Sequence, residues 1–131
     1  MNVRKHKRYE HGFSTIELSV VILVIIVLTI LIAPRIFALV SGARLAGVRQ
    51  EAAGIGAAIE ILKIEGRYDP RDEDLFELIF EETGVIYEGE LSELDADGGF
   101  VYGRTIGNEY YSARYDSSTG SVDGEIVGSA Q

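Results

Sequence analysis

Glu17 is the residue in this chain whose surroundings most clearly demand a chemical partner. It lies five positions after Gly12 and directly precedes seventeen uncharged residues, 18–34, of which only Ser19 and Thr29 are polar. An ionised carboxylate at the edge of hydrocarbon is penalised by roughly a few kcal/mol unless it gains a partner. We therefore expect Glu17 to form an ion pair, the alternative being that it only marks the head-group boundary of a membrane.

Few other residues could form a catalytic or metal site. The chain has no cysteine, and both of its histidines lie within the first eleven residues. A disulfide framework and cysteine-based zinc or thiol chemistry are thereby excluded. Beyond its acidic residues the sequence offers no convergent set of titratable groups, so we expect neither enzymatic activity nor a bound cofactor.

The acidic residues include two candidate calcium ligand sets. Asp95 and Asp97 in "LDADGG" resemble part of a calcium loop, and Asp116 with Asp123 forms a second pair. In the first set the next acid and the glycine fall at the wrong offsets for an EF-hand. The acids of residues 72–82 are more typical of a solvated helix face. We therefore predict hairpin turns and no metal site.

Charge is distributed unevenly along the chain. Residues 13–131 carry 8 basic and 20 acidic side chains, a formal charge of −12. Residues 1–12 carry a formal +3, from Arg4, Lys5, Lys7 and Arg8 against Glu10. Basic residues next to a membrane span remain on the cytoplasmic side, so the acidic remainder is predicted to lie outside. Its negative charge argues against nucleic acid as a partner.

The uncharged run is long enough to cross a membrane, although it lies near the lower limit. A cleaved secretory signal peptide has the same basic and apolar regions and is the first alternative. Three features argue against it: the length of the run, the acid Glu17 at its start, and Pro34 directly after Ala33, the most plausible cleavage point. We predict a single membrane span, in contact with lipid.

Beyond Pro34 the apolar pattern narrows to a stripe. Its members recur at spacings of 3, 4, 3, 4 and 3 residues, at Leu45, Val48, Ala52, Ile55, Ile59 and Leu62. This period predicts one helix from about residue 13 to about residue 65, with the stripe forming a core. Pro34 predicts a kink or a short unwound stretch. The glycines at 42, 47, 54 and 56 indicate either a weak helix or a helix that packs closely against copies of itself.

The rest of the chain predicts a short helix and a small sheet. Asp69 as N-cap and Pro70 as first helical residue favour a helix over about 70–83, closed by Gly84, with Leu75, Leu78 and Ile79 facing inward. Three β-rich runs, at 99–107, 108–116 and 120–128, predict an antiparallel meander of three or four strands. The fold class is α+β: a long N-terminal helix, transmembrane in its first half and amphipathic in its second, packed on a short helix and a small antiparallel β-sheet.

The stretch Gly12-Phe13-Ser14-Thr15-Ile16-Glu17-Leu18 resembles the class III signal of type IV pilins and type II secretion pseudopilins. A short basic leader precedes it and a uniform apolar helix containing Pro34 follows, as in that family. The usual family form of the first six mature residues is Phe-Thr-Leu-Ile-Glu-Leu, and Ser14 and Thr15 replace the usual Thr and Leu here. The remainder resembles the family in its pilin-like architecture only.

The resemblance implies how the chain would be processed. A prepilin peptidase would cut after Gly12 and remove the leader 1–12, and Phe13 would become the mature N-terminus and be N-methylated. Glu17, the fifth mature residue, would pair with a Phe13 amine of the same chain or of the chain ahead in a fibre. Residues 13–35 would form the transmembrane and assembly half of the helix. Residues 36–131 would form a periplasmic or extracellular head that includes the rest of the helix.

The implied function is that of a structural subunit of a type IV pilus-like filament. Its partners would be the prepilin peptidase, other copies of itself or related pilins, and an inner-membrane assembly platform. It would lie in the inner membrane before assembly, and afterwards in a pilus or fimbrium at the cell surface or in a periplasmic pseudopilus. A type II secretion pseudopilin is one alternative. A single-span anchored protein that binds a partner and forms no filament is the other.

Overall fold

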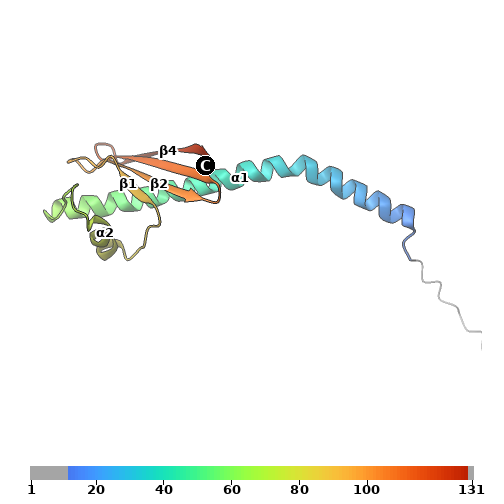
Figure 1. The fold of residues 1–131 in the computed structure, drawn as a ribbon, viewed down its shortest axis with the longest axis horizontal. Coiled ribbons are helices and arrows are strands. Elements are labelled where there is room, and N and C mark those ends of the chain that lie inside the picture. Colours follow the sequence, from blue (N-terminus) through green and yellow to red (C-terminus); the bar gives the residue numbers. More distant parts are fainter. Residues whose placement is uncertain (1–11, 130–131) are drawn as a thin grey trace, which may run out of the picture. The chain divides into compact units, whose positions relative to one another are not determined.

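The computed structural model of the chain describes residues 12–129. Its elements follow the order α1 (Thr15–Ile64), α2 (Leu75–Thr83), β1 (Glu90–Ser92), β2 (Phe100–Ile106), β3 (Glu109–Asp116) and β4 (Ser121–Ser129) (Figure 1). The predicted α+β class, with one long helix, one short helix and a small antiparallel sheet, is confirmed. The chain divides into two compact units between Ala38 and Leu39.

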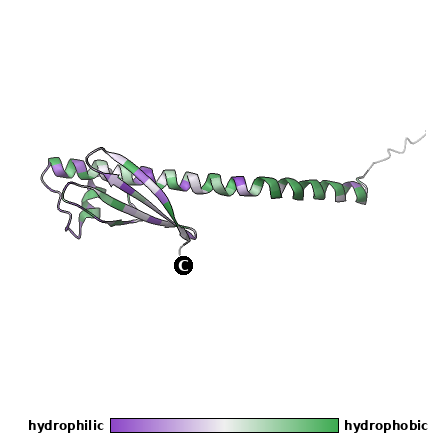
Figure 2. Ribbon diagram, turned by 90° about the horizontal axis from the view of Figure 1, so that it is seen from above, coloured by the Kyte–Doolittle hydropathy of each residue, from purple (hydrophilic) through white to green (hydrophobic). Residues whose placement is uncertain are grey.

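The first unit contains the apolar half of α1. This half is hydrophobic along most of its length (Figure 2), and its most apolar 18-residue window has a mean hydropathy of 3.1 with none of the window buried. By length and composition α1 can therefore cross a membrane. The helix continues through Pro34 without interruption. Of the two alternatives for Pro34, an unwound stretch is not observed, and the kink stays a prediction.

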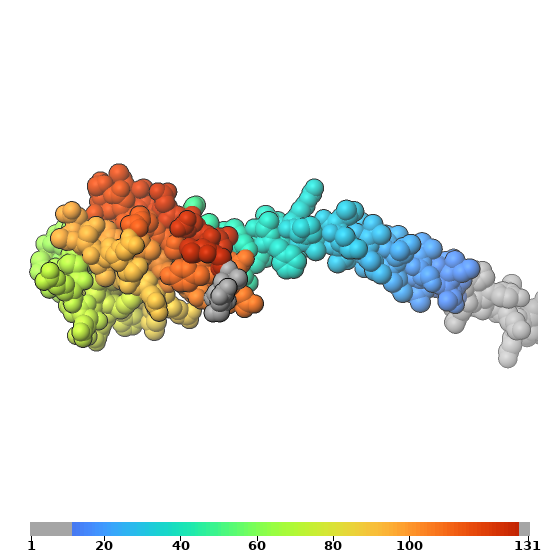
Figure 3. All heavy atoms as spheres, turned by 45° about the horizontal axis from the view of Figure 1, so that its top comes forward, coloured from blue at the N-terminus to red at the C-terminus, as the bar shows by residue number. Residues whose placement is uncertain are grey.

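The second unit is built on the amphipathic half of α1. The predicted stripe is confirmed as core: Leu45 is partly buried, and five residues are no more than 1% exposed, namely Val48, Ala52, Ile55, Ile59 and Leu62. The strands lie over this half of the helix (Figure 3), and their side chains join the same buried cluster, chiefly Phe100, Tyr102, Tyr111, Ala113 and Tyr115. One helical stripe and one face of a sheet thus form the hydrophobic core.

The sheet is an antiparallel meander of four strands in the order β1-β2-β3-β4. Within it Tyr102 lies opposite Ala113, and Ala113 lies opposite Gly124. The predicted turn between β3 and β4 is confirmed, because the Gly120 N–H donates to the Asp116 carbonyl at 2.8 Å. The count of four lies within the predicted three or four strands, but the sequence did not locate β1, since three residues with one apolar side chain carry no periodic signal.

Helix α2 begins later than the sequence predicts. The Asp69 carboxylate accepts a hydrogen bond from the Arg71 N–H at 2.9 Å, and the Asp72 carboxylate accepts one from the Asp74 N–H at 3.0 Å. These two local turns compete with the helix, so Asp69 is not its N-cap and Pro70 is not its first residue. The prediction for this end is wrong. At the other end Gly84 closes α2 with a positive φ of 68°, as predicted.

Two of the helix glycines make room for tyrosines of the same chain. A Cβ at Gly56 would lie 2.4 Å from the Tyr115 ring, and one at Gly54 would lie 2.8 Å from the Tyr87 hydroxyl. Close approach within the chain therefore explains these two glycines without a second copy. Cβ atoms at Gly42 and Gly47 would meet no atom within 4 Å, so both alternatives stay open there.

Gly56→Ala is expected to lower the free energy of unfolding by about 1–3 kcal/mol, because the added methyl group displaces Tyr115 from the core. Tyr115 would also leave its stack on Phe100, whose ring centroid is 5.2 Å away. Gly47→Ala is the matched control, and it is expected to raise stability by up to about 1 kcal/mol through helix propensity. Chemical denaturation of the full chain in detergent micelles measures both. Equal effects of the two variants would contradict the Tyr115 contact.

Candidate functional site

The candidate site is the start of α1 and the residues just before it. Gly12, Phe13 and Ser14 lie outside the helix, which begins at Thr15, and all three are exposed. The Phe13 side chain is 86% exposed. The bond between Gly12 and Phe13, the predicted cleavage point, therefore lies in accessible non-helical backbone, where proteolytic cleavage is favoured.

Glu17 and Ser14 are joined by two reciprocal hydrogen bonds. The Ser14 N–H donates to Glu17 Oε2 at 2.9 Å, and the Glu17 N–H donates to Ser14 Oγ at 3.2 Å. This arrangement is a capping box, and it satisfies two amide donors at the start of the helix that have no carbonyl partner in the chain behind them. The Glu17 carboxylate also lies in the first turn, where the helix dipole favours negative charge.

Ser14 is the residue of the candidate site that sequence reasoning missed, and its observed role is to cap the helix. It entered the sequence analysis only as a departure from the usual family form. The Ser-x-x-Glu spacing just before an apolar run is itself a signature of a helix start, and it was the signal that could have identified Ser14. Thr15, the other departure, contributes its carbonyl oxygen to a hydrogen bond from Ser19 Oγ at 2.8 Å.

From Leu18 to Pro34 the helix is a segment with no charged side chain and two hydroxyls. Its two hydroxyls are used within the helix, since Ser19 donates to the Thr15 carbonyl and Thr29 donates to the Ile25 carbonyl at 2.7 Å. The large side chains of residues 20–32 are about half exposed, and a groove of about 370 Å³ runs between Ile25, Leu28, Thr29, Ile32, Ala33, Ile36 and Phe37. Such a surface requires lipid or other apolar helices around it.

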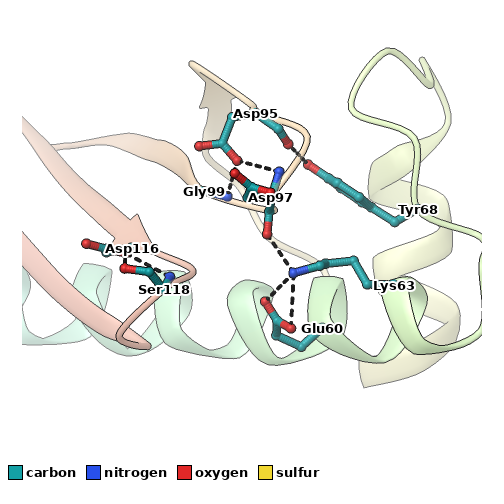
Figure 4. Close-up of polar contacts among 8 residues, drawn as sticks. All are labelled: Glu60, Lys63, Tyr68, Asp95, Asp97, Gly99, Asp116 and Ser118. Atoms are coloured by element: carbon teal, nitrogen blue, oxygen red, sulfur yellow. Dashed lines mark hydrogen bonds and ion pairs between the residues drawn. The ribbon is translucent and has the colours of Figure 1, made fainter.

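The acids considered as candidate calcium ligands organise their own loops (Figure 4). Asp95 Oδ1 accepts hydrogen bonds from the N–H groups of Asp97 at 3.0 Å and Gly99 at 2.7 Å. The loop is held from outside by Tyr68, whose hydroxyl donates to the Asp95 carbonyl, and by Lys63, whose ammonium donates to the Asp97 carbonyl at 2.6 Å. Burial raises the pKa of the Tyr68 hydroxyl, which keeps it a donor.

The second acid pair is not a convergent site either. Asp116 accepts hydrogen bonds from both the hydroxyl and the N–H of Ser118, and these bonds lower the pKa of the Asp116 carboxyl. Asp123 lies on β4, opposite Arg114 of β3. Within residues 12–129 no group of three or more acidic or histidine side chains is placed to hold a metal ion.

Two polar clusters fasten the sheet to α1. In the first, Glu51 accepts a hydrogen bond from the Tyr102 hydroxyl at 2.7 Å and pairs with Arg104, which also pairs with Glu88. Burial, followed by the bond to Glu51, raises the pKa of Tyr102. Every contact in this cluster joins one part of the head to another, so the cluster has a structural role.

In the second cluster Glu109 accepts hydrogen bonds from the hydroxyls of Tyr111 and Ser41, with Arg44 3.8 Å away. The Tyr111 bond is the main cause of the lowered pKa of Glu109. Ser41 and Arg44 belong to α1, whereas Glu109 and Tyr111 belong to β3. The cluster therefore anchors the start of β3 to the helix.

Of the predicted site residues, Glu17 lies in the first turn of α1, and Gly12 and Phe13 lie just before the helix. Pro34 lies seventeen residues beyond Glu17 in the same helix and takes no part in the site. Comparison of the chain with models of known protein families, with curated proteins and with solved structures found no match.

Asp95→Ala is expected to lower the free energy of unfolding by about 1–3 kcal/mol, because two amide donors of its loop lose their acceptor. The effect is expected to be the same in calcium and in a chelator. Asp123→Ala removes an exposed acid from β4 and serves as the control. Thermal unfolding of the full chain in micelles measures all four cases. A calcium-dependent rise in midpoint that Asp95→Ala abolishes would show that the loop binds a metal.

Proposed function

We propose that this chain is the precursor of a structural subunit of a type IV pilus-like filament, processed by a prepilin peptidase and assembled from the inner membrane. One observation carries the proposal. The bond between Gly12 and Phe13 is exposed and non-helical, and the helix that follows has one acid, Glu17, in its first turn and then no charged residue up to Pro34. That arrangement matches the signal that the prepilin family uses.

The charge pattern supports the proposed topology. The basic leader remains in the cytoplasm, the apolar half of α1 spans the membrane, and the acidic head lies outside. In the membrane, lipid covers the exposed apolar side chains of the helix. In a filament, the same half-helices of neighbouring copies cover one another. Since lipid and apolar helices are similar environments, close packing must favour the filament.

The position of Glu17 supports assembly through an ion pair. Cleavage after Gly12 creates a charged amine on Phe13, and an amine buried among apolar helices requires a counter-charge. Glu17 is the single acidic residue of α1 before Glu51. It is therefore the natural partner of that amine in the apolar part of a fibre.

The second unit supports a structural role for the head. Its core consists of apolar and tyrosine side chains, and Arg67 and Arg104 each pair with acids of the same unit. Within the described residues no buried side-chain nitrogen or oxygen lacks a hydrogen-bond partner. A head of this kind presents a stable acidic surface on a fibre.

The first test is the intact mass of the protein recovered from membranes of cells that contain a prepilin peptidase. Loss of residues 1–12 together with an added methyl group is expected. A full-length mass would contradict the proposal and would favour a single-span anchored protein. Imaging of fibres sheared from the surface then separates a pilus from a short periplasmic pseudopilus of the type II secretion kind.

Glu17→Ala is expected to leave cleavage after Gly12 intact and to reduce sheared fibres by roughly tenfold or more, because the amine loses its counter-charge. Glu77→Ala removes an exposed acid of α2 and is the control, with fibres expected at the unmodified level. Immunoblots of sheared and cell-bound fractions measure the outcome. Normal fibres in the Glu17 variant would refute the assembly role.

A further inference from the structure

We propose that Arg49 blocks the open edge of the sheet, so that strand β4 of one copy does not pair with strand β4 of a second copy. Strand β4 is the last in the order β1-β2-β3-β4, and among the described strands it pairs with β3 alone. An edge strand carries unpaired backbone donors and acceptors, which form a template for a strand of another chain. The inference concerns the head and holds whether or not the chain forms a filament.

The two edges of the sheet differ in length. Strand β1 has three residues, too few to support pairing with another strand. Strand β4 has nine, and its pairing with β3 is regular from Ser121 to Ile126. The register then shifts between Tyr110 and Tyr111 of β3, and such a bulge twists the rest of the strand away from a flat partner. The edge that requires protection is therefore the segment 121–126.

Arg49 of α1 binds the middle of this segment. Its guanidinium donates a hydrogen bond from Nη2 to the Gly124 carbonyl at 3.0 Å. In an antiparallel pair, the backbone groups of successive residues point alternately to the neighbouring strand and to the open side. Counted from the pair Asp116–Ser121, which closes the hairpin, the backbone groups of Gly124 lie on the open side. A strand added at this edge would have to displace the guanidinium.

The glycine at position 124 makes this contact possible. A Cβ atom there would lie 2.8 Å from Arg49 Nε and 3.2 Å from Leu45 Cδ1. Gly124 is not among the glycines with a positive φ, so its backbone conformation does not require glycine. A glycine inside a strand weakens the strand unless another group must approach the backbone closely. Arg49 is the group that approaches Gly124.

No carboxylate of the described residues competes for Arg49. Within residues 12–129 its guanidinium forms no ion pair, whereas four other arginines of the head pair with carboxylates, namely Arg44, Arg67, Arg104 and Arg114. The Arg49 side chain is exposed, so its hydrogen bond to the strand is made at the surface, where a second copy would arrive. The guanidinium therefore serves the edge and not a neighbouring charge.

Two acids beside Gly124 add repulsion to this block. Asp123 and Glu125 are exposed and flank Gly124 on β4. In an antiparallel pair of β4 strands centred on Gly124, Asp123 of each copy would lie directly opposite Glu125 of the other. Like charges at directly opposite positions are destabilising. Self-pairing of β4 is therefore opposed twice, at the backbone by Arg49 and at the side chains by the acids.

A chain that α1 holds in a membrane has particular need of this protection. Copies confined to one membrane plane meet one another at a high effective concentration. Pairing of their open edges would join heads irreversibly, as exposed edge strands do in aggregation. With the edge blocked, contacts between copies are left to other surfaces.

Arg49→Ala in the full chain, in detergent micelles, is the primary test. Loss of the guanidinium is expected to raise edge-to-edge association by roughly tenfold. The measurement is hydrogen exchange, followed by mass spectrometry, at increasing protein concentration. An added strand protects those amides of residues 121–126 that face the open side, whereas association through α1 leaves them unchanged. Protection that rises with concentration is expected in Arg49→Ala and not in the unmodified chain.

Gly124→Ala reaches the same state by another route. Its methyl group displaces the Arg49 side chain while the arginine remains in the chain, so the same protection is expected. Arg49→Lys keeps a charged donor at the edge and is expected to restore the unmodified behaviour. Arg71→Ala removes another exposed arginine, in the turn before α2, and is the matched control.

The contribution of the acids is measured through salt. In Arg49→Ala only the repulsion between Asp123 and Glu125 still opposes pairing, and salt screens exposed charges. Protection of residues 121–126 is therefore expected to increase with ionic strength. Asp123→Asn added to Arg49→Ala removes the repulsion, so this double variant is expected to show the same protection at low salt.

Absence of concentration-dependent protection in both Arg49→Ala and Gly124→Ala would overturn the inference, as would equal protection in Arg71→Ala. Faster exchange throughout β4 in dilute Arg49→Ala would also overturn it, because Arg49 would then hold the strand in place and not block its edge. The filament proposal is tested separately, by the mass of the mature chain and by fibre formation.

Discussion

One constraint organises the structure: the two halves of the continuous helix α1 need different surroundings, because the first half is apolar and the second half is apolar only along a stripe. From Leu18 to Pro34 α1 carries no charged side chain, and none of its most apolar window is buried in the structure. From Leu45 onward only a stripe is apolar, and one face of a four-stranded sheet is enough to bury it. The division of the chain into two units follows from this change of pattern within a single helix.

Tyrosine rings pack directly against glycines in the second unit, and these contacts help to hold its helix and strands together. Gly56 admits the ring of Tyr115, and Gly89 admits the ring of Tyr102, so large flat side chains lie directly on backbone. Polar clusters around Glu51 and Glu109 then fasten strands to the helix at positions that the core does not reach. In a chain without cysteine, packing and these clusters do the work of a disulfide framework.

The start of α1 illustrates how one residue can meet two physical demands. A helix end needs acceptors for its first amide donors, and a membrane-spanning segment disfavours an unpartnered charge. The Glu17 carboxylate meets the first demand through Ser14. The same hydrogen bond gives the carboxylate a polar partner at the start of the apolar segment, which bears on the second demand as well.

Local patterns along the chain were sufficient for the elements that depend on near neighbours: the apolar segment, the stripe that became the core, the three long strands, and the glycine that ends α2. They failed at the start of α2, because the local turns at Asp69 and Asp72 compete with the helix. They also failed to locate β1, because a strand of three residues is too short to show a period. Only the tertiary structure decided what Gly54 and Gly56 are for and which residues Glu51 and Glu109 bind, because those partners lie far away in the sequence. Ser14 was missed although its spacing to Glu17 is local. The direction in which the carboxylate turns, back onto the Ser14 amide, was decided by the three-dimensional arrangement of the first helical turn.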